Sequence, residues 1–164
     1  ISKVESGTSD LDRNPVSLKE LILNMHELYE PIAESDGIKL NYEVNEDIII
    51  NGNYNLLSQA LANLIENAIN YGCSNNNPAI NVGAKKNENL LSLWVSDNGI
   101  GIRDADKDKV LERFVRLDSS RSLKGSGLGL NLVSSAVKFH EGALKLINAK
   151  PSGLIILIEI PLDS

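Results

Sequence analysis

A single cysteine, Cys73, occurs in the 164 residues, so the chain can form neither an intrachain disulfide nor a zinc cluster with several cysteine ligands. This usage suits a reducing compartment. No run of 18 or more apolar residues occurs, the length that a transmembrane helix requires. Basic residues are also few, since 16 Lys and Arg stand against 22 Asp and Glu, a net charge of −6. That sign argues against a nucleic-acid or anionic-membrane partner, and any phosphate must be recognised locally.

What the chain does contain is an ordinary share of apolar residues, 42%, which fits one soluble globular domain. Helical spacing predicts three helices. The first begins at a capping box of Ser17 and Glu20, and Pro31 is expected to kink or end it. The second begins at Asn53 and ends at Gly72. The apolar positions are Leu18, Leu21, Ile22, Met25, Tyr29 and Ile32 in the first, Leu57, Leu61, Leu64, Ile65, Ala68 and Ile69 in the second, and Leu132, Val133, Ala136 and Val137 in the third.

Alternation of apolar and polar residues predicts three hairpins. Along the chain, the three helices and three hairpins follow in the order helix, hairpin, helix, hairpin, helix, hairpin. This order is not the strict strand–helix alternation of a parallel doubly wound sheet. We therefore expect an α+β fold, a two-layer α/β sandwich whose mixed, mostly antiparallel sheet is covered on one face by the three helices. The paired segments are 38–44 with 48–50, 79–84 with 90–95, and 144–147 with 154–160.

A long charged segment with weak periodicity separates the last two helical regions, from Gly99 to Gly125. Segments of this length inside a compact domain are usually functional lids. We expect a lid at about residues 102–124.

Three glycines at alternate positions, in Gly125-Ser126-Gly127-Leu128-Gly129-Leu130, run directly into the third predicted helix. Glycines let backbone N–H groups converge on an anion, and the positive end of a helix dipole lies behind them. The stretch is therefore a candidate phosphate cradle, with a flexible hinge as the alternative. It is not a P-loop, because no Gly-Lys-Ser or Gly-Lys-Thr occurs in the chain.

A second glycine pair follows a predicted strand, in Asp97-Asn98-Gly99-Ile100-Gly101-Ile102. An ionised aspartate only accepts hydrogen bonds, so Asp97 at the mouth of an apolar pocket would select a donor such as an exocyclic amine. A simple turn is the alternative, because Asp-Asn-Gly at a strand end needs no ligand.

Asn63, Asn67 and Asn70 lie at i, i+4 and i+7 of the second predicted helix, roughly opposite its apolar side. Asparagine is a mediocre helix former, and amide oxygens are suitable hard ligands for Mg²⁺. A solvated helix face is the alternative.

Four basic residues near the lid, Arg113, Arg116, Arg121 and Lys124, could reach a phosphate. Arg116 is the strongest candidate, because it follows Phe114 and Val115 and precedes the glycine stretch.

In order along the chain, residues 63–71, 97–101, 114–116 and 125–130 closely resemble the N box, first glycine box, F box and second glycine box of one family. This family is the catalytic ATP-binding domain of bacterial sensor histidine kinases, within the GHKL superfamily. The resemblance covers about residues 12–161. It implies a Bergerat fold, in which ATP lies between the N-box helix and the lid.

The resemblance also implies roles for single residues. Asp97 would accept a hydrogen bond from the adenine amine, Asn67 would coordinate Mg²⁺ bridging the phosphates, and Asn63 would lie beside them. Arg116 would steady the γ-phosphate, and residues 125–129 would supply backbone donors. Asn63, Asn67 and Arg116 are thus the catalytic candidates. The other implied nucleotide contacts are Asn70, Tyr71, Gly99, Gly101, Ile102, Lys124, Ser126, Leu128 and Leu130.

The function implied is phosphotransfer in two-component signalling, from ATP with Mg²⁺ to a histidine on a dimerisation domain absent from this chain. Without that domain we expect no autophosphorylation. Residues 1–12 resemble the end of a dimerisation helix and a linker, and residues 13–164 the catalytic domain. The implied partners are the dimerisation domain, a response regulator and a second copy of the parent chain. The domain is expected in the cytoplasm, whether or not its parent is membrane-anchored, and without direct membrane contact.

Three positions depart from the family pattern. Asn70 replaces a usual Lys, Asn53 replaces a usual acidic residue, and Glu141-Gly142 replaces Gly-Gly. The uncharged Asn70 favours a second hypothesis, a regulatory module that binds nucleotide without phosphotransfer. A third is an ATP-hydrolysing relative, as in type II topoisomerases or mismatch-repair ATPases. Those proteins place a Glu where this chain has Asn63, which leaves no evident base to activate water.

The two histidines are expected to be structural. His26-Glu27-Leu28 with Pro31 superficially resembles a phosphoacceptor box. However, the N box begins at Asn63, too close to leave room for a dimerisation hairpin, so His26 is expected beside the core face of the first helix. His140 is expected to cap or pack the end of the third helix.

Overall fold

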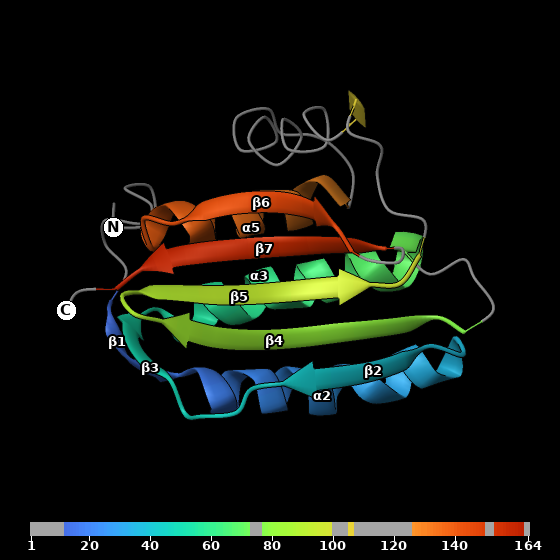
Figure 1. Cartoon of the computed structure of the whole chain (residues 1–164), viewed down its shortest axis with the longest axis horizontal. Coiled ribbons are helices and arrows are strands. Elements are labelled where there is room, and N and C mark those ends of the chain that lie inside the picture. The colour runs from blue at the N-terminus through green and yellow to red at the C-terminus, as the bar shows by residue number, and fades with distance from the viewer. Residues whose placement is uncertain (1–11, 73–76, 100–104, 107–125, 150–152, 163–164) are drawn as a thin grey trace.

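The computed structural model describes residues 12–72, 77–99, 105–106, 126–149 and 153–162. A five-stranded sheet forms one layer, and helices cover one of its faces (Figure 1). Among these strands, β2 and β4 are parallel, and each other neighbouring pair is antiparallel. The mixed, mostly antiparallel sheet is therefore confirmed. In spatial order its strands are β2 (Lys39–Glu43), β4 (Ala79–Asn87), β5 (Leu90–Asp97), β7 (Leu154–Pro161) and β6 (Ala143–Asn148).

The covering helices are α2 (Leu18–Ser35), α3 (Tyr54–Asn67) and α5 (Ser126–Phe139), and α3 continues into a π-helix, η2 (Ala68–Gly72). Their apolar sides meet one face of the sheet in a single core, and burying each Leu or Ile there contributes about 1.5–3 kcal/mol. None of the described helices is long and apolar enough to cross a membrane. The most deeply buried side chains include Leu21, Ile22, Leu57, Leu61, Leu64, Ile80, Leu91, Leu93 and Ile158.

A small second sheet corrects the first predicted hairpin. β3 (Ile49–Gly52) pairs antiparallel with β1 (Asn14–Ser17), a strand that the sequence did not predict, while β2 pairs with β4. The expected pairing of residues 38–44 with 48–50 was wrong, because alternation determines which side of a strand is buried but not which strand it joins. The sequence did not predict β1 because the strand has only four residues and includes Pro15, which is typical of edge strands and gives no alternating pattern.

The first helix begins as predicted but ends later. The Ser17 hydroxyl oxygen accepts a hydrogen bond from the backbone N–H of Glu20 at 3.1 Å, which confirms the N-cap. Pro31 does not end the helix, which continues to Ser35. Pro31 is exposed, so water can replace the hydrogen bond that its missing N–H would have made. Ile32 was also misassigned to the core, since 47% of it is exposed.

The second and third predicted hairpins are confirmed. Strand β5 pairs along its whole length with residues 80–87 of β4, and β6 pairs with β7. The turn between β4 and β5 falls at the predicted polar residues, where Glu88 has a φ of 58°. Leu91, Leu93 and Val95 are buried on the helix-facing side of β5.

His140, directly after α5, joins the end of that helix to the start of α3. The residue is 4% exposed. Its Nδ1 lies 2.8 Å from the carbonyl oxygen of Ala136, and its Nε2 lies 3.0 Å from the backbone nitrogen of Asn53. Because an amide N–H can only donate, Nε2 accepts this bond and Nδ1 carries the ring proton. The expected capping and packing role of His140 is thus confirmed, for a neutral imidazole.

Asn53 and Arg13 complete this junction. The Asn53 side-chain oxygen accepts the Leu56 N–H at 2.9 Å as the N-cap of α3, and its amide nitrogen donates to the Asp12 carbonyl at 2.9 Å. The Arg13 guanidinium lies over the Phe139 ring, 4.3 Å from its centroid, and donates to the Phe139 carbonyl. The predicted N-cap is confirmed, and asparagine at position 53 has a structural role.

The end of α5 is a Schellman motif. The N–H of Glu141 donates to the Lys138 carbonyl at 3.0 Å, and that of Gly142 donates to the Val137 carbonyl at 2.9 Å. Glu141 occupies the left-handed position, with a φ of 57°, where glycine is usual. A Cβ on Gly142 would lie 2.5 Å from the carbonyl oxygen of Glu159, so this second position requires glycine.

We expect Glu141→Gly to stabilise the domain by about 0.5–1 kcal/mol, because it removes left-handed strain that exceeds the added chain entropy of glycine. Gly142→Ala is the matched substitution at the neighbouring position and should destabilise through the close approach to Glu159. Urea unfolding of both variants measures the difference, and an unchanged or lower midpoint for Glu141→Gly would contradict the strain.

The buried His140 predicts a pH dependence of stability. Burial, helped by the nearby positive charge of Arg13, lowers the pKa of His140. Its folded-state pKa then lies below the unfolded value of about 6.5, so the unfolded chain binds more protons in this range. The free energy of unfolding should therefore fall as pH drops below about 6.5, by at most about 1.4 kcal/mol per pH unit.

Denaturant unfolding between about pH 7.5 and pH 5.5 tests this dependence, with one variant for each of the two histidines. His140→Gln lacks the titrating imidazole and should lose that part of the slope, whereas His26→Gln should retain it. Equal slopes in the two variants would show that His140 does not control the effect.

Candidate functional site

Three of the motifs singled out in the sequence lie at one end of the sandwich. α3 and α5 pack against each other, and the bond between Asn53 and His140 places the start of α3 beside the end of α5. The two helices are therefore antiparallel, and the first turn of α5 lies at the end of α3 that carries Asn67 (Figure 1). β5 ends with Asp97 at the same end, and η2 contacts β5.

The N-box asparagines occupy the last turns of α3 and the π-helix that follows. Asn63 and Asn67 are half-buried, and Asn70 is exposed. The i, i+4, i+7 spacing would place Asn63, Asn67 and Asn70 on one face of an α-helix. Asn70 lies in η2, where hydrogen bonding is i→i+5, so it does not continue that face. Single π-turns are often found at functional sites. The backbone of Tyr71 also belongs to η2.

Asn63 carries the main polar anomaly of this region. Within the described part of the chain, its side-chain nitrogen is buried and has no hydrogen-bond partner. Leaving a buried donor unpaired costs about 1–3 kcal/mol. Such an atom requires an acceptor, and a phosphate oxygen is one that would satisfy it.

Asp97 is held at the end of β5 on the side that faces the helices, in the same alternation as the buried Leu93 and Val95. Its carboxylate accepts the Gly99 N–H at 2.9 Å and also the N–H of Leu154. Partial burial raises the pKa of Asp97, and these two hydrogen bonds oppose the rise. The carboxylate is therefore fixed in place as a hydrogen-bond acceptor.

Two residues that support Asp97 were missed by the sequence reasoning. Gly153 has a φ of 117°, and a Cβ there would lie 1.9 Å from the carbonyl oxygen of Asp97, so only glycine fits. Asn98 ties the turn to β4, since its side-chain oxygen accepts the Ala79 N–H and its amide nitrogen donates to the Asn77 carbonyl, both at 2.9 Å. The only sequence signal was glycine before a strand and asparagine in a turn.

A contact between α2 and α3 was also missed. The Tyr29 hydroxyl donates to the Glu66 carboxylate at 2.6 Å, next to Asn67 in the chain. Burial and the Glu66 carboxylate both raise the pKa of Tyr29. Tyr29 was predicted only as a core residue, because helical spacing gives no information on what its hydroxyl meets.

The second glycine box differs from its expected form. α5 begins at Ser126, so the backbone of Gly127, Leu128, Gly129 and Leu130 lies in the first turns of the helix, not in a preceding loop. The N–H groups at such a helix start, with the positive end of the helix dipole, are of the kind that can attract an anion. Five other candidates and most of the lid, about 102–124, lie outside the described residues. These five are Gly101, Ile102, Arg116, Lys124 and Gly125.

A divalent cation has one evident class of ligand here. Among the described residues, no three His, Cys, Asp or Glu side chains come together as a metal site. Asn67 offers a half-buried amide oxygen of the kind that Mg²⁺ accepts, and the donor set would be completed by phosphates and water. The Asn67 side chain is therefore a suitable ligand for Mg²⁺ when a phosphate supplies further oxygen ligands.

Comparisons with known proteins agree with this geometry. Residues 52–164 match the family described as histidine kinase-, DNA gyrase B-, and HSP90-like ATPase. The chain is 34% identical over 168 residues to an uncharacterized sensor-like histidine kinase of Rhizobium meliloti strain 1021, covering 100% of this chain and 31% of that protein. It is 29% identical to the autoinducer 2 sensor kinase/phosphatase LuxQ of Vibrio parahaemolyticus, covering 98% and 20%. The chain thus spans less than one third of either relative.

Solved structures confirm the predicted fold. The nucleotide-free catalytic domain of histidine kinase ThkA superposes with a TM-score of 0.75 at 25% identity, covering 93% of this chain and 98% of that one. Full-length ShkA, solved in complex with AMPPNP, superposes with a TM-score of 0.75 at 25% identity, covering 94% and 32%. The similarity to histidine kinase catalytic domains is confirmed.

Proposed function

The chain belongs to the family of histidine kinase-, DNA gyrase B- and HSP90-like ATPases, and we propose that it is the ATP-binding catalytic domain of a two-component sensor histidine kinase. It transfers the γ-phosphoryl of ATP to a histidine of a dimerisation domain in a longer, homodimeric parent, from which a response regulator takes it. The observation that carries this proposal is the meeting of Asp97, the asparagines of α3 and the first turn of α5 at one end of the sandwich.

Asp97 recognises the base. Its carboxylate is fixed by the N–H groups of Gly99 and Leu154, and it faces the helix layer. A fixed carboxylate accepts the exocyclic amine of adenine, whereas the carbonyl at the same position of guanine would meet it as a second acceptor. This contact selects ATP over GTP.

The phosphates lie between α3 and the start of α5. The N–H groups and dipole of the α5 N-terminus attract them, and the unpaired amide nitrogen of Asn63 supplies a further donor. Local donors are needed because the whole chain carries a net charge of −6. Arg116, outside the described residues, steadies the γ-phosphate.

Asn67 would hold Mg²⁺ through its amide oxygen. When bound, the ion would supply positive charge that offsets the negative charge of the phosphates during transfer. The chain contributes by holding base and phosphates in line with the acceptor, since phosphoryl transfer depends chiefly on positioning and electrostatic stabilisation.

One observation favours the second candidate, a module that binds nucleotide without phosphotransfer. Asn70 is exposed and uncharged where the resembling family usually has Lys. Without the positive charge of a lysine side chain at this position, contact with the phosphates would be weaker, whereas the contact of Asp97 with the base would be unaffected.

A single experiment separates these functions. The domain is titrated with γ-labelled ATP and Mg²⁺, and the dimerisation domain of the longer protein is then added. We expect saturable binding followed by an acid-labile label on the dimerisation domain. Binding without transfer supports the regulatory module, and the absence of binding contradicts both.

Asp97→Asn tests the base contact in the same assay. Losing a charged acceptor should weaken ATP binding by about 1.5–3 kcal/mol, roughly 10- to 150-fold, and should reduce the preference over GTP. Glu46→Gln removes one negative charge from the exposed loop between β2 and β3 and should bind as the wild type does. Unchanged ATP affinity in a folded Asp97→Asn variant would remove Asp97 from the site.

Asn67→Ala tests the metal contact. It should reduce affinity for ATP with Mg²⁺ more than affinity for ATP in EDTA, because the amide oxygen is an Mg²⁺ ligand in this proposal. Asn55→Ala, an exposed substitution in the first turn of the same helix, controls for the change in helix propensity. Calorimetry that finds equal losses with and without Mg²⁺ would exclude the metal role.

A further inference from the structure

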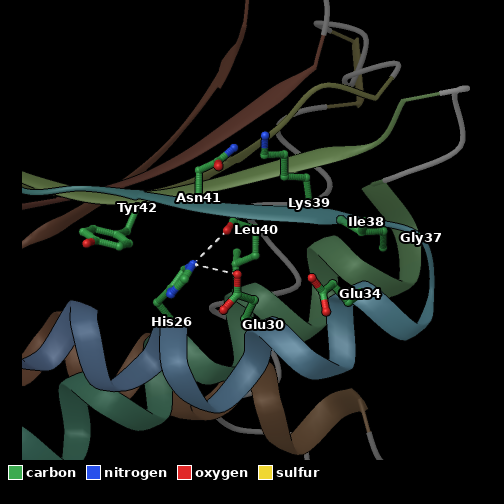
Figure 2. Close-up of a pocket in the computed structure, with 9 residues that line it drawn as sticks. All are labelled: His26, Glu30, Glu34, Gly37, Ile38, Lys39, Leu40, Asn41 and Tyr42. Carbon is green, nitrogen blue, oxygen red and sulfur yellow. Dashed lines mark hydrogen bonds and ion pairs between the residues drawn. The ribbon is translucent and has the colours of Figure 1, made fainter.

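A cavity of about 510 Å³ lies between β2 and α2, outside the nucleotide site (Figure 2). β2 is an end strand of the five-stranded sheet and pairs only with β4 within the described residues. His26, Glu30 and Glu34 line the cavity from α2, and Leu40 and Tyr42 line it from β2. The cavity is therefore bordered by a sheet edge, where a further strand could be added.

The backbone of β2 determines which groups are available at that edge. The N–H of Lys39 donates to the Pro78 carbonyl at 3.0 Å, so Lys39 directs its polar groups toward β4. Directions alternate along a strand, and Leu40 and Tyr42 consequently direct their N–H and C=O groups away from β4. Those groups face the space in which an added strand would lie.

His26 covers one of these groups. Its Nε2 lies 2.8 Å from the Leu40 carbonyl oxygen, and because a carbonyl can only accept, this nitrogen is the donor. The imidazole also meets the Tyr42 ring edge to face, with centroids 4.9 Å apart. The expected position of His26 beside the core is thus confirmed. The imidazole occupies the Leu40 carbonyl at the sheet edge and leaves the backbone groups of Tyr42 accessible.

Two carboxylates, Glu30 and Glu34, and one lysine, Lys39, line this groove, so these three residues give it a net negative charge. Glu30 and Glu34 lie one helical turn apart, near the negative end of the α2 dipole, and the last turn of this fully described helix holds no basic residue. Like charges at i and i+4, and negative charges near the negative end of a helix dipole, each oppose helix stability by a few tenths of a kcal/mol. Helix formation therefore does not account for these two glutamates. Figure 2 shows Lys39 on the opposite side of the strand from these carboxylates.

We propose that the edge of β2 and the adjoining groove bind an extended, basic segment of a partner polypeptide. The segment adds to the sheet beside β2 by backbone hydrogen bonds at Tyr42, and one of its Arg or Lys side chains enters between Glu30 and Glu34. The Tyr42 ring, which is part of a residue 46% exposed, offers a face for a guanidinium. A second copy of this chain would bring the same carboxylates together and is disfavoured.

This docking site is separate from the proposed ATP site. β4 lies between β2 and the strand that carries Asp97. Nucleotide affinity can therefore serve as an internal control, since substitutions in the groove should leave it unchanged. Failure of the docking site would leave the proposed phosphotransfer function intact.

The first test uses two peptides, a capped alternating Arg-Val hexamer and its Glu-Val counterpart, titrated into isotope-labelled domain and followed by amide NMR. We expect the basic peptide to shift signals of residues 40–43 and the acidic peptide to leave them in place. Glu30→Gln with Glu34→Gln should weaken binding about threefold to tenfold. Glu27→Gln, exposed on the same helix, should not. Equal binding of both peptides, shifts confined to other residues, or no binding would overturn the proposal.

The second test separates backbone pairing from side-chain contact. Tyr42→Pro removes the outward N–H and leaves the β2–β4 ladder intact, whereas Tyr42→Thr removes the ring but keeps that N–H. The basic peptide should lose binding to the Pro variant and keep most of it with Thr. His26→Ala frees the Leu40 carbonyl and should strengthen binding several-fold, a gain that unfolding cannot produce. Similar binding by the Pro and Thr variants, or no gain with His26→Ala, would contradict strand addition.

Discussion

The hydrogen bond from the Asn53 N–H to Nε2 of His140 fixes the geometry on which the candidate site depends. It holds the start of α3 beside the end of α5, and the two helices of 14 residues pack antiparallel. Helices of this length extend about 21 Å, so the opposite ends, with Asn67 and Ser126, meet at the far side of the sandwich. A neutral imidazole at one end thus helps to position, at the other, the helix start that we propose as a phosphate site.

The start of β4 connects the two proposed binding surfaces, the nucleotide site and the edge of β2. The Pro78 carbonyl accepts the Lys39 N–H on the β2 side, and the Ala79 N–H donates to the Asn98 side chain on the β5 side. Two neighbouring residues therefore hold both the edge strand and the turn after Asp97. Their hydrogen bonds tie the edge strand to the turn that follows Asp97, part of the proposed nucleotide site.

Local patterns were sufficient for much of this molecule. Helical spacing located three helices, Asn53 was identified as an N-cap, and the strands on either side of Glu88 were paired correctly. The same reasoning selected Asp97 as an acceptor at a strand end and the asparagines of α3 as mediocre helix formers, with a simple turn and a solvated helix face as the alternatives. Resemblance to a known family then supplied the roles, and comparison with solved structures confirmed the fold.

The sequence by itself therefore determined which residues form each helix and most strands, and which side of each is buried. Tertiary structure alone decided the pairing of strands that no short turn connects, since β3 joins β1 and β2 joins β4 with no local signal for either. It also decided that Pro31 lies in a continuous helix and that His140 meets Asn53 from 87 residues away. Periodicity reports the environment of a side chain, whereas a partner distant in the chain is selected only when the whole core packs.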